Sequence, residues 1–100
     1  MAKNKKYQEW LIDSLKDHEA AVAYLNAALE ESLKGDAESQ EILLIALRNV
    51  AEAHGGLAKI AKKAHLGRES LYKTLSPRGN PSLSTFTALM NAMGLQLRFC

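Results

Sequence analysis

The sequence has little cysteine, proline or glycine, and each scarcity excludes a class of protein. Its one cysteine, Cys100, has no partner within the chain, which rules out an intramolecular disulfide framework and a cysteine-rich metal site. Two prolines and six glycines in 100 residues leave little material for linkers or low-complexity segments. Because 47% of the residues are hydrophobic, the chain can bury a core, and its length fits one compact domain.

Long apolar runs are also missing. No run approaches the roughly 18 to 20 residues that a membrane span requires, and no apolar stretch follows the positive start MAKNKKYQEW to form a signal peptide. We therefore expect a cytoplasmic protein without a membrane partner.

Motifs for nucleophilic catalysis or phosphate cradling are absent as well. The three histidines, His18, His54 and His65, fall on different expected elements, and no carboxylate or cysteine completes a ligand set. The sequence thus predicts a non-enzyme with no cofactor, no metal and no small-molecule substrate.

Acidic residues are nearly absent from the second half of the chain. Residues 1–54 carry six Lys or Arg and ten Asp or Glu, a net −4, whereas residues 55–100 carry seven Lys or Arg and the single acid Glu69, a net +6. Clustered cations displace counterions from phosphates, so the asymmetry favours a polyanionic partner for the second half. A solvated basic face accounts for the charge equally well.

The spacing of apolar residues predicts an all-α bundle of five to six helices. The expected helices cover 7–15, 18–32, 37–54, 57–64 and 68–75, followed by a final helix that ends at 93. Asp17, Asp36, and Ser82 or Ser84 are expected to cap helices, and Gly55 and Gly56 to separate the third from the fourth. Trp10 is expected to anchor the first helix, and the wide apolar surface of residues 42–51 implies burial on two sides.

Residues 95–99 alternate between apolar and polar, which is the period of a strand. A lone strand cannot satisfy its own backbone, so this short C-terminal strand is expected to pair with a second copy or with a partner, unless the segment is a frayed tail.

Residues 57–76 have the pattern of a helix-turn-helix unit, with a three-residue turn at 65–67 between two short helices. Ala61 allows the helices to approach closely, and Leu66 is expected to fill the turn. Ile60, Ala64 and Leu71 are expected to fill the space between the two helices. The second helix of such a unit enters the major groove of DNA and presents its N-terminal and outward side chains to the bases. Here those side chains are Arg68, Glu69, Tyr72 and Lys73.

The chemistry of each side chain suggests a role at DNA. Arg68 could read a guanine edge, Glu69 could accept from a cytosine amino group or orient Arg68, and Lys73 could reach guanine or phosphate. Tyr72 could pack on a thymine methyl group. The backbone N–H groups of Gly55 and Gly56 are expected to be free to bind a phosphate group of DNA, and the ammonium group of Lys59 could bind another phosphate.

The segment GGLAKIAKKAHLGRESLYKTLSPRGNPSLSTFTALMNAMGLQL resembles the Cro/C1-type (XRE) helix-turn-helix of small prophage and antidote proteins, and the chain is similar to the HigA-like probable addiction module antidote group. The similarity extends upstream through LKDHEAAVAYLNAALEES and EILLIALRNVAEAHGG, and GRESLYKTLSPRGNP is its most specific part. One departure is His65, which stands at a turn position where the family usually has glycine.

The resemblance implies a lambda-repressor-like fold, a homodimer that binds operator DNA and represses its own operon, and a cognate toxin of the RelE/ParE-like class. It places Arg68, Glu69, Ser70, Tyr72 and Lys73 on the recognition helix, and Arg78, Asn80 and Ser82 in the following loop near the DNA backbone. Residues 1–54 then form an acidic helical region with a possible toxin-contact surface, and residues 55–100 form the DNA-binding region with the dimerisation or partner strand.

Two other functions stay open at this point. One is a phage-type transcriptional regulator without a toxin, and the other is a protein-interaction module that has lost contact with DNA. The apolar face of residues 42–51, the acidic first half and the terminal strand are all candidate toxin-binding surfaces, and the sequence does not rank them.

Overall fold

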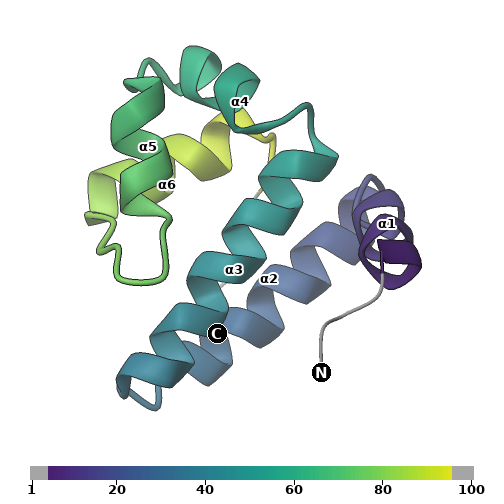
Figure 1. Cartoon of the computed structure of the whole chain (residues 1–100), viewed down its shortest axis with the longest axis horizontal. Coiled ribbons are helices and arrows are strands. Elements are labelled where there is room, and N and C mark those ends of the chain that lie inside the picture. The colour runs from purple at the N-terminus through teal and green to yellow at the C-terminus, as the bar shows by residue number, and fades with distance from the viewer. Residues whose placement is uncertain (1–4, 96–100) are drawn as a thin grey trace.

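The computed structural model describes residues 5–95, which form six helices (Figure 1). The helices are α1 (Lys5–Ser14), α2 (His18–Ser32), α3 (Ala37–Ala53), α4 (Leu57–Ala64), α5 (Arg68–Thr74) and α6 (Leu83–Ala92). The predicted all-helical class is confirmed, and each predicted helix is found within about two residues of its expected bounds. No strand occurs in residues 5–95.

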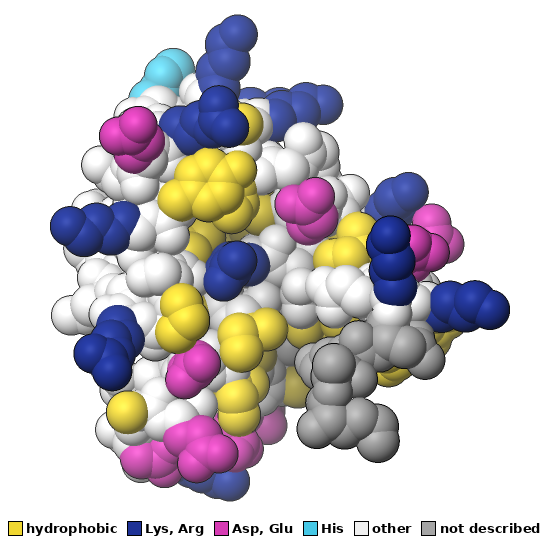
Figure 2. Space-filling model, in the orientation of Figure 1, with side chains coloured by type: hydrophobic (Ala, Val, Ile, Leu, Met, Phe, Trp, Pro, Cys, Tyr) yellow, Lys and Arg dark blue, Asp and Glu magenta, His cyan; other side chains and the backbone are white. Residues whose placement is uncertain are grey.

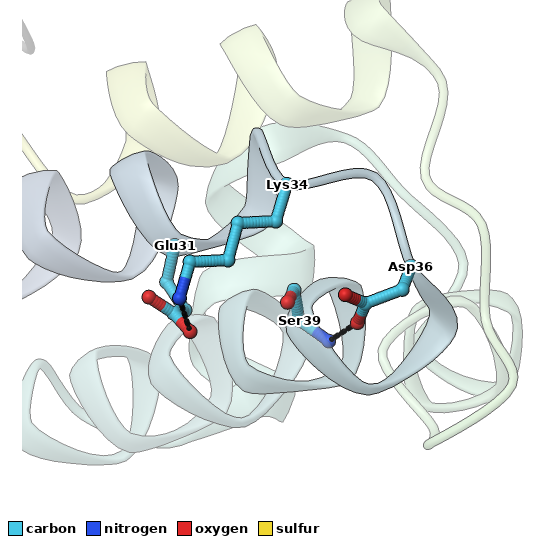
Figure 3. Close-up of polar contacts among 4 residues, drawn as sticks. All are labelled: Glu31, Lys34, Asp36 and Ser39. Carbon is cyan, nitrogen blue, oxygen red and sulfur yellow. Dashed lines mark hydrogen bonds and ion pairs between the residues drawn. The ribbon is translucent and has the colours of Figure 1, made fainter.

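Three helices begin at the side-chain caps that the sequence predicts. The carboxylate of Asp17 accepts from the backbone N–H of Ala20 at 2.9 Å, and that of Asp36 accepts from Ser39 at 2.8 Å (Figure 3). The hydroxyl of Ser82 accepts from the N–H of Thr85 at 3.1 Å. Each bond satisfies one of the N–H groups that a helix start leaves unpaired.

Three helices also end in a shared backbone motif. An N–H just beyond α3, α4 and α6 bonds to a carbonyl five residues earlier, in the pairs Gly56–Ala51, Leu66–Ala61 and Leu95–Met90, each at 2.9 Å. This motif requires a residue of positive φ before the donor, which is Gly55 (115°), His65 (58°) and Gly94 (68°). His65 is the one non-glycine residue of positive φ in residues 5–95.

The long helix α3 organises the molecule. It lies antiparallel to α2, contacts α1, and packs at its C-terminal end against α4, which in turn packs on α5 and α6 (Figure 1). Leu44, Leu47 and Val50 of α3 are buried in the core. These contacts account for the apolar surface of α3 being wider than one stripe.

A polar link joins the first three helices inside this arrangement. The side chain of Asn49 on α3 is 9% exposed, accepts from Gln8 of α1 at 3.0 Å, and donates to the hydroxyl of Tyr24 on α2 at 2.9 Å. A buried amide without such partners would be costly, so these bonds fix how α1 and α2 sit on α3.

The exposure of several apolar side chains corrects the sequence analysis. Trp10 is 63% exposed and Tyr7 is 46% exposed, so Trp10 does not anchor α1; the buried side chains there are Leu11 and Leu15. On α3, Ile42 and Ile45 are 41% and 40% exposed, so the burial expected across the apolar surface of residues 42–51 does not extend to these two side chains.

The predicted strand over 95–99 lies outside the described residues, apart from Leu95. That residue is 3% exposed, and its N–H closes the end of α6. Within residues 5–95, no helix is both long enough and apolar enough to cross a membrane.

Candidate nucleic-acid interface

Helix α5 has one buried side and one exposed side. Leu71 and Leu75 are 2% and 1% exposed and point into the core, four residues apart as one face of a helix requires. The five predicted contact residues of this helix are all exposed: Arg68, Glu69, Ser70, Tyr72 and Lys73. The structure therefore brings them together on the outer surface of α5.

The connection from α4 to α5 fixes how α5 is presented. Residues 65–67 form the predicted three-residue turn, in which His65 adopts the left-handed conformation (φ 58°, ψ 39°) expected at this position. Leu66 is half-buried there, while Ile60 and Ala61 of α4 are fully buried against the rest of the core. Leu66 packs on the core, as the sequence predicts, and its N–H bonds to the carbonyl of Ala61.

Within α5, two exposed side chains interact. The guanidinium carbon of Arg68 lies 5.8 Å from the centre of the Tyr72 ring, within the range of a cation–π contact. The two residues are four positions apart and therefore adjacent on the helix surface.

The loop after α5 places further predicted residues at the surface. Arg78 and Asn80 are exposed, whereas Gly79 between them is half-buried. A Cβ at Gly79 would overlap the carbonyl oxygen of Thr74, so glycine is required for the loop to fold back on the end of α5. Ser82 is exposed, but its hydroxyl is engaged in capping α6.

Helix α4 carries a row of cations beside this surface. Lys59, a predicted contact, is exposed together with Lys62 and Lys63, which the predicted contact set leaves out. Arg48 on α3 is also exposed and lines a hollow of about 290 Å³ with Tyr72 of α5. Sequence spacing does not place Arg48 near the predicted contact residues, because Arg48 lies in the acidic half of the chain. The packing of the helices brings it beside Tyr72.

One predicted contact is wrong. The amides of Gly55 and Gly56 are not free for a phosphate, because they donate to the carbonyls of Glu52 and Ala51 at the end of α3. The glycines supply the positive φ that terminates α3, and this conformation turns their N–H groups back toward the helix.

The cations of this surface have no carboxylate partners in the described part of the chain. Ion pairs in residues 5–95 join Lys16 to Asp13 and Lys34 to Glu31, both in the acidic half. The exposed Lys and Arg side chains between 48 and 78 form none. Figure 2 shows basic side chains along the region of α4 and α5 and a group of acidic ones at the opposite, lower end.

The described residues hold no cluster of three or more His, Cys, Asp or Glu side chains of the kind that binds a metal ion. The exposed side chains of α4, α5 and the following loop form a surface suited instead to a polyanion, with positive charge, hydrogen-bond donors and one aromatic ring. We call this set, Lys59, Lys62, Lys63, Arg68, Glu69, Ser70, Tyr72, Lys73, Arg78 and Asn80, the α4–α5 surface.

Comparisons with known proteins identify relatives of the chain. An uncharacterized protein of Haemophilus influenzae strain Rd is 36% identical over 86 residues, which cover 86% of this chain and 81% of that protein. No solved structure matches. The family model described as probable addiction module antidote protein matches residues 6–100, and the chain belongs to this family.

Proposed function

We propose that the chain is the DNA-binding antitoxin of a type II toxin–antitoxin module. In this proposal it acts in the cytoplasm as a non-enzymatic homodimer, represses its own operon through the α4–α5 surface, and neutralises a RelE/ParE-like toxin. Membership of an antidote family implies a toxin partner of some kind. The same proposal includes a lambda-repressor-like fold and a place for the chain in the HigA-like group of antidote proteins.

The observation that carries the DNA-binding part is the exposed, unpaired positive charge of the α4–α5 surface. Cations that are not neutralised by neighbouring carboxylates are free to replace the counterions of a phosphate backbone, and the release of those ions drives binding. The near absence of acids from this half of the chain removes the repulsion that would oppose it.

Helix α5 supports a role in reading bases. It is short, it is held from behind by Leu71 and Leu75, and it presents Arg68, Tyr72 and Lys73 outward. The DNA major groove admits a single helix in this orientation, and Arg and Lys side chains there hydrogen-bond to guanine edges. Lys59, Arg78 and Asn80 flank α5 and would contact the phosphate backbone.

The experiment is titration of the purified full chain against a labelled duplex covering the promoter upstream of its own gene, followed by fluorescence anisotropy. We expect binding to symmetric half-sites about one helical turn, roughly 34 Å, apart, with affinity that falls steeply as salt rises. Absence of binding to this duplex and to unrelated duplexes would overturn the DNA-binding role.

The toxin-binding part is tested by co-expression with the product of the adjacent reading frame. We expect the two proteins to co-purify, and growth arrest by that product to be relieved by this chain. DNA binding without such a partner would identify the chain as a phage-type regulator instead.

A further inference from the structure

A second surface lies on the acidic half of the molecule, away from the cations of α4 and α5. Tyr24, Ala27 and Ala28 of α2 and Ile42, Ile45 and Ala46 of α3 line a hollow of about 330 Å³ between the two helices. We call it the α2–α3 groove. Ile42 and Ile45 are about two-fifths exposed at its edge, which is high for isoleucine beside a core.

The shape of the groove is suited to binding another helix. Two antiparallel helices leave a furrow along their line of contact, and small side chains such as Ala27, Ala28 and Ala46 keep that furrow open. Ile42 and Ile45 lie on one face of α3 at helical spacing, as anchors for an apolar stripe on a partner would.

A second hollow adjoins the groove. Ile45 also lines the neighbouring hollow of about 290 Å³, whose lining is mixed and includes Arg48, Glu52 and Tyr72. In the face drawn in Figure 2, apolar side chains lie over α3 between the basic region and the acidic lower end.

Acidic residues outnumber basic ones on α2 and α3 near the groove, where Glu31, Glu38, Glu41 and Glu52 stand against Arg48 and against Lys34 of the connecting turn. Glu38 precedes Ile42 by one turn of α3, and Glu31 follows Ala27 by one turn of α2. Glu41 precedes Ile45 by one turn and also lines a separate hollow with Arg78. Glu52 lines the neighbouring hollow together with the exposed cation Arg48, so charges of both signs meet at that end of α3. Lys34, in the turn between α2 and α3, is paired with Glu31 at 2.9 Å (Figure 3).

We propose that the α2–α3 groove binds a positively charged amphipathic helix of the toxin. This inference rests on the proposed antitoxin function and names the surface and the partner chemistry that serve it. The acidic rim disfavours the other obvious occupants. A duplex would be repelled by it, and a symmetric contact between two grooves would bring the same carboxylates of two copies together.

The first test uses a defined probe and the full chain. The probe is a fluorescein-labelled peptide about 18 residues long, with Leu at helical spacing on one face and Lys on the other. A second peptide carries Glu in place of every Lys. We expect the Lys peptide to bind and the Glu peptide not to bind, because the rim is acidic.

Groove variants are compared with matched controls. The double change Ile42→Ser with Ile45→Ser should weaken binding of the Lys peptide at least about tenfold, whereas Leu83→Ser, at a leucine that is 79% exposed on α6, should leave it unchanged. Glu38→Gln with Glu41→Gln should weaken it, and Glu9→Gln with Glu19→Gln should weaken it less. Circular dichroism and thermal unfolding establish that every variant is folded.

Equal binding of the Lys peptide to the wild type and to the Ile42/Ile45 variant would overturn the inference, as would tight binding of the Glu peptide. Self-association of the wild type that is lost in the Ile42/Ile45 variant, measured by sedimentation, would show that a second copy occupies the groove and would also overturn it.

The same variants are then co-expressed with the product of the adjacent reading frame. Capture by the wild type and loss of capture by the Ile42/Ile45 variant, with promoter binding retained, supports the inference. Equal capture by the wild type and by the variant would show that the α2–α3 groove is not the toxin-binding site, and would leave the antitoxin function intact. No capture by the wild type rejects the toxin as occupant and the antitoxin function together.

Discussion

The guanidinium of Arg68 lies over the ring of Tyr72, with 5.8 Å between the guanidinium carbon and the ring centre, on the exposed side of α5. The contact holds a flexible side chain close to the helix surface without neutralising its charge. Arg68 is therefore partly ordered before any partner arrives, and less conformational entropy is lost when it binds.

The first prediction concerns the charges of α5. Arg68→Ala and Lys73→Ala should each weaken binding to the promoter duplex and reduce its salt dependence, because each removes a cation without touching the core. Fluorescence anisotropy at several salt concentrations measures both effects. Lys16→Ala, at an exposed lysine in the acidic half, serves as the control and should bind DNA like the wild type.

Unfolding of both the Arg68 and the Lys73 variants would contradict the assignment of these side chains to the surface. Unchanged DNA affinity in folded variants would remove α5 from the interface.

The second prediction concerns the buried side of the same helix. Leu71 is 2% exposed, so Leu71→Ala should lower the free energy of unfolding by about 2–5 kcal/mol through the cavity that it leaves. Urea denaturation provides the measurement. Leu33→Ala, at a leucine that is 78% exposed, should change the stability by less than about 0.5 kcal/mol. Similar losses in the two variants would mean that α5 is not packed as described.

The third prediction concerns the turn before α5. His65 holds a left-handed conformation that disfavours residues with a Cβ, and the equivalent positions after α3 and α6 are glycine. His65→Gly should stabilise the protein by about 0.5–1 kcal/mol, since relief of this strain exceeds the entropy that glycine gains on unfolding. His65→Val should destabilise it. Loss of stability in the glycine variant would show that the imidazole makes a contact worth more than the strain.

The fourth prediction concerns the loop after α5. Gly79→Ala should destabilise the protein by about 1–3 kcal/mol and weaken DNA binding, because the added methyl group collides with the carbonyl of Thr74 and displaces Arg78 and Asn80. Gly67→Ala is the control, since a Cβ there meets nothing closer than the Ser70 hydroxyl oxygen at 3.6 Å. Thermal unfolding and the promoter titration compare the pair, and equal behaviour would refute the close approach.

The fifth prediction concerns the start of α3. The backbone N–H of Ser39 bonds to the Asp36 carboxylate and lowers the pKa of that group below its ordinary value, with help from the Ser39 side chain and the charge of Lys34. A carboxyl with a lowered pKa in the folded state stabilises the protein above its ordinary pKa. That stabilisation is lost as the pH falls through the lowered value.

Asp36→Asn and Asp36→Ser keep a side-chain cap that cannot ionise. Both variants should therefore lose stability less steeply than the wild type when the pH is lowered from about 5 to about 2. Parallel wild-type and variant curves of unfolding free energy against pH would contradict the role of Asp36.

Much of the fold could be predicted because its signals are local. Asp17, Asp36 and Ser82 cap helices at positions fixed by a few neighbouring residues, and Gly55 marks the end of α3 by the same logic. The predicted contact residues of α5 are exposed for a related reason, since the spacing of Leu71 and Leu75 alone decides which side faces inward.

The rest depends on contacts between helices that sequence spacing does not contain. Trp10 and Leu11 are neighbours on a short helix, and only the position of α3 decides that Leu11 is buried and Trp10 is not. Ile42 and Ile45 belong to a continuous apolar run, but no described helix covers them. From its polarity alone, Asn49 would be expected at the surface. In the structure it is buried, because Gln8 of α1 and Tyr24 of α2 form hydrogen bonds with it.

The separation of charge along the chain has a consequence for how the protein meets any partner. One end of the molecule in Figure 2 carries a group of acidic side chains, and the α4 and α5 region carries unpaired cations, so a molecule of net charge +2 presents regions of opposite charge to a partner. Near a negatively charged polymer such as heparin, we expect the molecule to rotate so that the region of α4 and α5 faces the polymer. The same polarity should make it adhere to cation and anion exchangers alike at low ionic strength.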